Sequence, residues 1–130
     1  MLASLQAIPG LEVSLPHRRF LQEQPDDALY SHQSIYYGLI HAPQAWDATH
    51  GSSTVSVAVI DSGVDIGHPD LASKISATYN AVDGSADVSD SMGHGTFIAG
   101  VVGAATGNGS GVAGMGWNTT VTAVKVANAA

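Results

Sequence analysis

The most regular apolar pattern in the chain is the run Val-Ser-Val-Ala-Val-Ile at residues 55–60. An almost continuous run of branched apolar residues predicts a strand that is buried on both faces, as in a parallel sheet. Weaker patterns predict two further strands, at residues 75–81 and 121–126. We expect the last of these strands to leave an unpaired edge on the sheet.

Helical patterns are fewer. Residues 97–104 carry Ala and Gly at helical spacing, which predicts a helix packed closely against a neighbour. Residues 43–48 begin with a proline, as helices often do. The polar stretch 17–34 indicates an exposed connection, and residues 106–116 form a glycine-rich loop. The order of strand, strand, helix and strand over residues 55–126 predicts an α/β fold with a parallel sheet.

Charge and composition exclude several classes of function. The chain has four Lys and Arg residues against eleven Asp and Glu, a formal net charge of −7. Four scattered cations cannot form a basic face that follows phosphates, so we expect no nucleic-acid partner. The same deficit disfavours an anionic membrane surface, and we expect no membrane association. The chain contains no cysteine, which excludes disulfides and thiol nucleophiles.

Two residues stand where chemistry is expected. Asp61 follows the first strand, at the edge where open α/β sheets bind their ligands. His94 lies between two glycines at the start of the predicted helix. An aspartate that orients a histidine provides two members of a nucleophilic hydrolase site, in which the histidine is the general base. Position alone also allows a turn-capping aspartate and a purely structural pair.

The residues around these two positions resemble a known family. Residues 57–65 and the following His-Pro-Asp-Leu at 68–71 resemble the segment around the catalytic aspartate of the subtilisin-like serine peptidases, or subtilases. Residues 93–100 resemble the segment around their catalytic histidine. The resemblance implies a Rossmann-like subtilase half-domain with part of a parallel sheet. It also implies serine endopeptidase activity on a polypeptide substrate, with Asp61 and His94 as two members of an Asp-His-Ser triad.

The resemblance predicts how the chain is divided. Residues 27–130 are similar to the N-terminal part of a subtilase catalytic domain, and residues 1–26 to a propeptide-like tail and linker. The family's nucleophilic serine lies further along its chains, so we expect the 130-residue chain to be an inactive fragment. Its expected partner is the missing C-terminal half of the catalytic domain. Because family members are mostly exported, the resemblance implies an extracellular location.

An alternative is a non-catalytic calcium-binding or inhibitory module derived from a subtilase. The presence of both Asp61 and His94 weighs against this alternative, because such a module has no need of either side chain.

The resemblance also implies a structural calcium ion. Asp70 matches a carboxylate ligand of the family's high-affinity site, and Asn108 matches a side-chain ligand in the glycine-rich loop. The ligand from the N-terminal segment is either Asp27 or Gln33, which match the residues of two branches of the family. Calcium binds several charged and neutral oxygens, which this set supplies. The simpler alternatives are a turn or capping carboxylate for Asp70 and a turn residue for Asn108.

Overall fold

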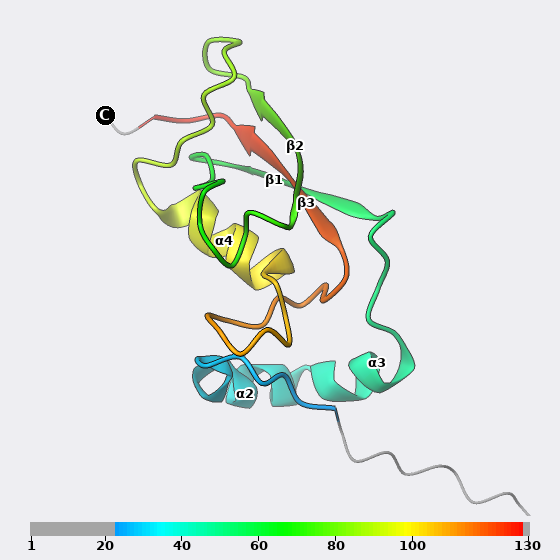
Figure 1. Cartoon of the computed structure of the whole chain (residues 1–130). Helices are drawn as coiled ribbons and strands as arrows, with labels where there is room; N and C mark the ends of the chain where they lie inside the picture. The colour runs from blue at the N-terminus through cyan, green and yellow to red at the C-terminus, as the bar shows by residue number, and fades with distance from the viewer. Residues whose placement is uncertain (1–22, 129–130) are drawn as a thin grey trace, which may run out of the picture.

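A three-stranded parallel sheet lies at the centre of the structure, a computed structural model that describes residues 23–128 (Figure 1). The strands are β1 (Ser56–Asp61), β2 (Ile75–Asn80) and β3 (Thr120–Lys125), in the order β1-β3-β2. The predicted α/β class with a parallel sheet is confirmed. The predicted propeptide-like tail and linker covers residues 1–26, of which residues 1–22 lie outside the described residues.

The position of β3 corrects one expectation. This strand pairs with β1 on one side and with β2 on the other, so it is the central strand. The prediction that the last strand leaves an open edge is therefore wrong. Within residues 23–128 the edge strands are β1 and β2.

The burial of β1 corrects a second expectation. Val59 is its only buried residue, whereas Val57 is 37% and Ile60 64% exposed. Ile60 is exposed because, among the described helices, α4 (His94–Gly103) packs on one face of the sheet and the opposite face is uncovered (Figure 1). Val57 lies on the same face as Val59 and lines a cavity beside α4. Ile60 aligns with Val124 of β3, and Val124 with Tyr79 of β2, so an apolar row crosses the sheet.

The main core lies between the sheet and α4. This helix begins three residues before the predicted range, and it buries Ala99, Gly100 and Gly103. Small side chains allow the helix backbone to approach the strands closely. The buried apolar residues of this core come from β1, β3, α4 and the intervening loops: Val59, Val64, Leu71, Val88, Ala99, Ala104, Val121 and Ala123.

A second core joins two helices to the glycine-rich loop. Helix α3 (Ala42–Ala48) agrees with the predicted helix. Helix α2 (Tyr30–Leu39) begins inside the stretch that was expected to be an exposed connection, which corrects a third expectation. Tyr37 of α2 meets Trp46 of α3 edge-on, with ring centroids 5.3 Å apart. The Tyr37 hydroxyl donates to the Ala113 carbonyl at 2.7 Å, and burial raises the pKa of Tyr37 to about 12.

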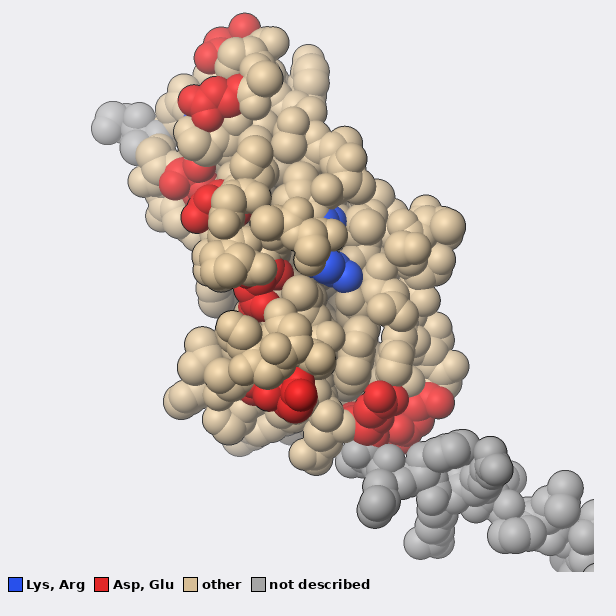
Figure 2. Space-filling model, in the orientation of Figure 1, with Lys and Arg blue, Asp and Glu red and all other residues tan. Residues whose placement is uncertain are grey.

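The surface carries few cations. In the described residues, Lys74 donates to the Trp117 carbonyl at 2.6 Å, and Lys125 is buried and donates to the Ser89 carbonyl at 2.7 Å. On the face in Figure 2, acidic side chains gather in several places around one small basic area. The expectation of no nucleic-acid partner stays a prediction. No helix in residues 23–128 is long and apolar enough to cross a bilayer.

Candidate active site

Asp61 is the last residue of β1, and its place is fixed by the sheet. Its carbonyl accepts the backbone N–H of Val126 at 2.8 Å, which continues the pairing with the chain just after β3. Its carboxylate accepts the backbone N–H of Ser62 at 2.7 Å. The side chain is only 19% exposed. Asp61 is therefore held at the carboxyl edge of the sheet, where a parallel sheet places its ligands.

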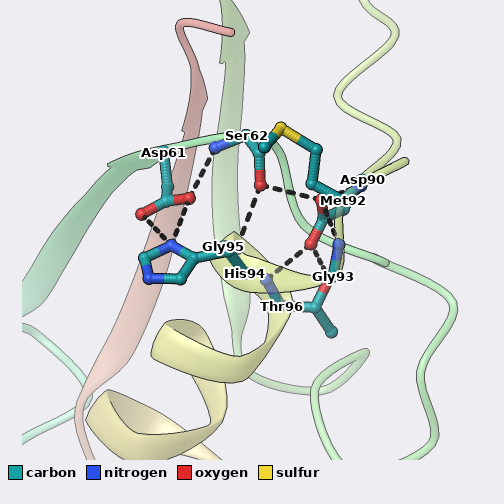
Figure 3. A network of polar contacts seen from close by, with 8 residues as sticks. All are labelled: Asp61, Ser62, Asp90, Met92, Gly93, His94, Gly95 and Thr96. Carbon is teal, nitrogen blue, oxygen red and sulfur yellow. Dashed lines mark hydrogen bonds and ion pairs between the residues drawn. The ribbon is translucent and has the colours of Figure 1, made fainter. Parts of the chain in front are cut away.

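His94 is the first residue of α4, and its ring points at Asp61 (Figure 3). The imidazole Nδ1 lies 2.8 Å from Asp61 Oδ1 and 2.9 Å from Oδ2. The side chain is 63% exposed. Among the described residues, Nε2 of His94 makes no hydrogen bond. The structure therefore brings together the two residues that the sequence singles out for chemistry.

Electrostatics fix which nitrogen carries the proton. The hydrogen bond to His94, followed by that from the Ser62 N–H, holds the pKa of Asp61 below its usual value. An ionised carboxylate only accepts hydrogen bonds, so Nδ1 must be the donor. In the neutral ring, Nε2 then carries the lone pair. This nitrogen faces outward and can take a proton from a hydroxyl group placed next to it.

Close contact between two glycines allows this geometry. A Cβ on Gly95 would collide with the carbonyl oxygen of Gly63 and would lie 3.0 Å from the Cβ of Asp61. Gly63 has φ of 111°, and a Cβ there would lie 2.5 Å from the Val88 carbonyl oxygen. A side chain on Gly95 would push the start of α4 away from the end of β1. A side chain on Gly63 would also strain the backbone, because its positive φ favours glycine.

Asp90 is a site residue that sequence reasoning missed, since the sequence places it in an acidic loop. Its Oδ1 accepts the Ser62 hydroxyl and the backbone N–H groups of Met92 and Gly93, at 2.8–3.0 Å. Its Oδ2 accepts the N–H and the hydroxyl of Thr96, at 2.8 and 2.7 Å. Burial alone would raise the pKa of Asp90, but the hydrogen bonds from Thr96, Ser62 and Met92 outweigh it and hold that pKa well below its usual range.

The predicted calcium ligands divide into two groups. The Asn108 amide donates to Asp70 Oδ1 at 2.9 Å, and Asp27 Oδ2 accepts the N–H of Gly107 at 2.9 Å, so three of the four meet at the glycine-rich loop. Gln33 contacts a later part of the same loop, where its amide bonds both the N–H and the carbonyl of Ala113. In residues 23–128, no three acidic or histidine side chains gather as a metal cluster.

Two apolar hollows lie near this site, and neither is lined by Asp61 or His94. A cavity of about 840 Å³ opens between α2 and α4, lined by Tyr36 of α2 and by Phe97 and Val101 of α4, among others. A second cavity of about 560 Å³ continues from it toward Val57 of β1. Several of the lining side chains are exposed: Tyr36, which lines both cavities, is 67% exposed, and Phe97, which lines the first, is 68% exposed.

Comparison with known proteins decides the family. The profile of the subtilase family matches residues 52–130, more than half of the chain. The chain belongs to the subtilase family. It is 45% identical over 103 residues to the thermophilic serine proteinase of Bacillus sp. (strain AK1) and 38% identical over 102 residues to thermitase of Thermoactinomyces vulgaris. These matches cover 78% of this chain in each case.

A solved structure shows the same fold. The chain superposes on the proteases from Pseudoalteromonas arctica PAMC 21717 with a TM-score of 0.71 at 34% identity, over 80% of this chain and 39% of that one. The chain spans 25% of the length of the Bacillus proteinase and 36% of that of thermitase. Subtilase relatives also include a protein named major intracellular serine protease, from Bacillus subtilis (strain 168). Family membership therefore does not decide the location, and the extracellular expectation stays a prediction.

Proposed function

We propose that the chain is part of a serine-type endopeptidase, in which Asp61 and His94 are two members of an Asp-His-Ser triad. The observation that carries this proposal is the pair itself: an aspartate in contact with His94 Nδ1, with Nε2 directed outward. Membership of the subtilase family supports it. The nucleophilic serine is proposed to come from a segment outside these 130 residues.

The proposed reaction uses Nε2 of His94 twice. It accepts the hydroxyl proton of the serine while the serine oxygen attacks the carbonyl carbon of the peptide bond. It then donates that proton to the leaving amine, and the carbonyl carbon stays bound to the serine as an ester. Water then loses a proton to the same nitrogen and attacks the ester carbonyl carbon. The serine oxygen leaves and takes that proton back, and the product with its new carboxyl group is released. Asp61 holds the ring and stabilises the imidazolium that forms in each step.

Among residues 23–128, the serine nearest in sequence to this pair is already engaged. The Ser62 hydroxyl donates to Asp90 at 2.8 Å and accepts the N–H of Gly95 at 3.1 Å. No serine of the described residues is hydrogen-bonded to His94. These contacts support the proposals that the chain alone is inactive and that it needs a complementing segment.

The test is complementation. The chain is produced together with the part of the Bacillus AK1 proteinase that follows its matched region, and hydrolysis of a chromogenic peptide is measured. We expect turnover in the complex, inhibition by a serine-reactive phosphonate, loss of turnover in His94→Ala, and no turnover by the chain alone.

Three outcomes separate the alternatives. A complex that forms but does not hydrolyse the peptide contradicts the endopeptidase proposal and favours a calcium-binding or inhibitory module. Turnover by the chain alone contradicts the proposed inactivity. Turnover that survives His94→Ala contradicts the role of His94.

A structural calcium ion at the glycine-rich loop belongs to the same proposal. Asp27 Oδ1 is buried without a hydrogen-bond partner, and a buried carboxylate oxygen in that state is costly unless a cation compensates it. Asp70 is also buried and contacts the same loop. Asp27, Asp70, Asn108 and backbone carbonyls would hold the ion, which would fix the loop. The engaged amide of Gln33 favours Asp27 as the ligand from the N-terminal segment.

The apolar cavities support the proposed partner. They expose Tyr36, Leu39, Phe97 and Val101 over two adjoining hollows. Large contiguous apolar surfaces mark the places where another protein surface docks. We assign this surface to the C-terminal half of a subtilase catalytic domain, because the chain spans only 25% of the Bacillus AK1 proteinase and 36% of thermitase.

A further inference from the structure

Asp90 connects the two chain segments that carry the Asp61–His94 pair. On the side of β1 it accepts the hydroxyl of Ser62, the neighbour of Asp61. On the side of α4 it accepts the N–H groups of Gly93 and Thr96, which lie on either side of His94. One carboxylate therefore bonds next to both members of the pair without touching either side chain (Figure 3).

The network extends beyond an ordinary helix cap. A capping residue satisfies the free N–H groups of the first turn, which Asp90 does for Thr96. The Ser62 hydroxyl, which donates to Asp90, also accepts the N–H of Gly95, so the next free N–H of α4 is bonded to the end of β1. The Thr96 hydroxyl accepts the N–H of Asp65 at 2.9 Å, which adds a second link to the segment after β1.

The side chain of His94 is otherwise weakly held. It is 63% exposed, and Asp61 is its one hydrogen-bond partner among the described residues. The ring orientation therefore depends on how the backbone of residues 93–96 sits against residues 61–62. We propose that Asp90 is a positioning residue, whose carboxylate locks these two segments together and thereby sets the orientation of His94 toward Asp61. The catalytic meaning of this role rests on the proposed function.

The test reads the His94–Asp61 contact directly. The full chain is labelled with ¹⁵N in its histidine rings, and the Nδ1 proton of His94 is observed by NMR. Asp61→Asn identifies the signal by removing it. In Asp90→Asn, we expect this proton to exchange with water faster by about tenfold or more, because the strong hydrogen bonds to an ionised acceptor are lost. An unchanged exchange rate overturns the proposal.

Two controls separate positioning from stability. Val121→Ala removes buried core volume outside the network and destabilises the chain without touching the contacts of Asp90. Asp87→Asn neutralises a neighbouring acidic residue whose carboxylate accepts only the local N–H of Ser89. Both variants should keep the slow exchange at a temperature where they are folded. Equally fast exchange in Val121→Ala overturns the proposal, because a general loss of stability would then account for the effect.

If Asp90→Asn does not fold, two substitutions of Thr96, which perturb the network less, provide the same test. Thr96→Val deletes the hydroxyl that donates to Asp90 and accepts the N–H of Asp65, and Thr96→Ser retains that hydroxyl. We expect faster exchange in the valine variant and rescue in the serine variant, and the absence of this difference overturns the proposal. None of these readouts requires hydrolysis. If the complemented protein proves inactive but Asp90→Asn still alters the His94 signal, the proposed function fails and the positioning role stands.

Discussion

At the scale of single residues, the Asp61 carboxylate fixes one tautomer of His94, and this gives a prediction for catalysis. In the complemented protein, Asp61→Asn should lower turnover by about 10⁴-fold, because the amide can donate to Nδ1 and stabilise the tautomer whose Nε2 carries a proton. Peptide hydrolysis at saturating substrate measures this loss. The matched control is Asp65→Asn, whose carboxylate accepts only the local N–H of Gly67. A fall of less than tenfold in Asp61→Asn would contradict the assigned role.

The residues proposed to act in catalysis were easier to predict from the sequence than the residue proposed to position them. Asp61 and His94 stand out because one ends a strand and the other is flanked by glycines. Asp90 was not predicted because three of its partners are backbone N–H groups and the other two are the hydroxyls of Ser62 and Thr96, which form no recognisable pattern of residue types. The only feature of the sequence that indicates this role is its position: Asp90 lies four residues before His94, and a glycine immediately precedes the helix.

At the scale of elements, the contact between α4 and β1 depends on the absence of a side chain at Gly95. Gly95→Ala should lower the free energy of unfolding by about 1–3 kcal/mol, as overpacked cores do, since its Cβ would collide with the Gly63 carbonyl. The matched control is Gly38→Ala in α2, where a Cβ meets nothing within 4 Å. That change should raise stability by about 0.5–1 kcal/mol through helix propensity. Urea unfolding measures both, and equal effects would argue against the close packing.

The dependence of the unfolding free energy on pH in acid tests how much the Asp90 carboxylate stabilises the start of α4. The folded-state pKa of Asp90 is depressed, so its contribution is fully present above the unfolded value, about 3.9, and is lost as the pH falls below it. Between pH 5 and pH 3, which are about one unit on either side of that value, the unfolding free energy of the natural chain should therefore decline more steeply than that of Asp90→Asn. Urea unfolding at several pH values measures the two slopes. Parallel slopes would show that the carboxylate of Asp90 does not contribute.

Element order and element type were predictable to different degrees. The three strands follow from their apolar patterns, α4 from the spacing of its small residues and α3 from the proline at its start. Helix α2 was not predicted because its apolar residues do not lie on one buried face. Tyr30 and Tyr37 are buried, whereas Ile35, Tyr36 and Leu39 are exposed. The central place of β3 was missed because strand order in a parallel sheet depends on crossover connections, which leave no local signature.

At the scale of the whole molecule, calcium would link the N-terminal segment to the glycine-rich loop. Adding calcium at about a hundred times its dissociation constant should stabilise the chain by about 2.7 kcal/mol, and a chelator should reverse this. Asp27→Asn should abolish the response, because it removes the charge at the unpartnered oxygen. The matched control is Asp26→Asn, whose carboxylate accepts the N–H of Gly109 in the same loop. Melting curves with and without calcium measure the response, and one that survives in Asp27→Asn excludes this ligand.

The same calcium experiment distinguishes Asp27 from Gln33 as the calcium ligand of the N-terminal segment. Gln33→Ala removes an amide that bonds the N–H and carbonyl of Ala113. It should lower stability equally with and without calcium, since its contacts are with protein groups. A calcium response lost in Gln33→Ala and kept in Asp27→Asn would reverse the proposed assignment.

The uncovered apolar surface gives a prediction about the partner that packs against it. Phe97 is 68% exposed on α4, lines the larger cavity and lies three residues from His94. Phe97→Glu should leave the melting temperature of the chain alone almost unchanged, because the ring has little burial to lose. It should lower the binding of an apolar fluorescent dye and prevent assembly with the complementing segment, because a buried unpaired carboxylate is costly.

The matched control is Val82→Glu. Val82 is also exposed, at 43%, but lies in the loop after β2 and lines neither cavity. Co-purification with the complementing segment measures assembly, and dye fluorescence measures the free surface. We expect normal assembly for Val82→Glu and none for Phe97→Glu. If both variants assemble equally well, the partner covers another surface, such as the uncovered row of Ile60, Val124 and Tyr79 on the opposite face of the sheet.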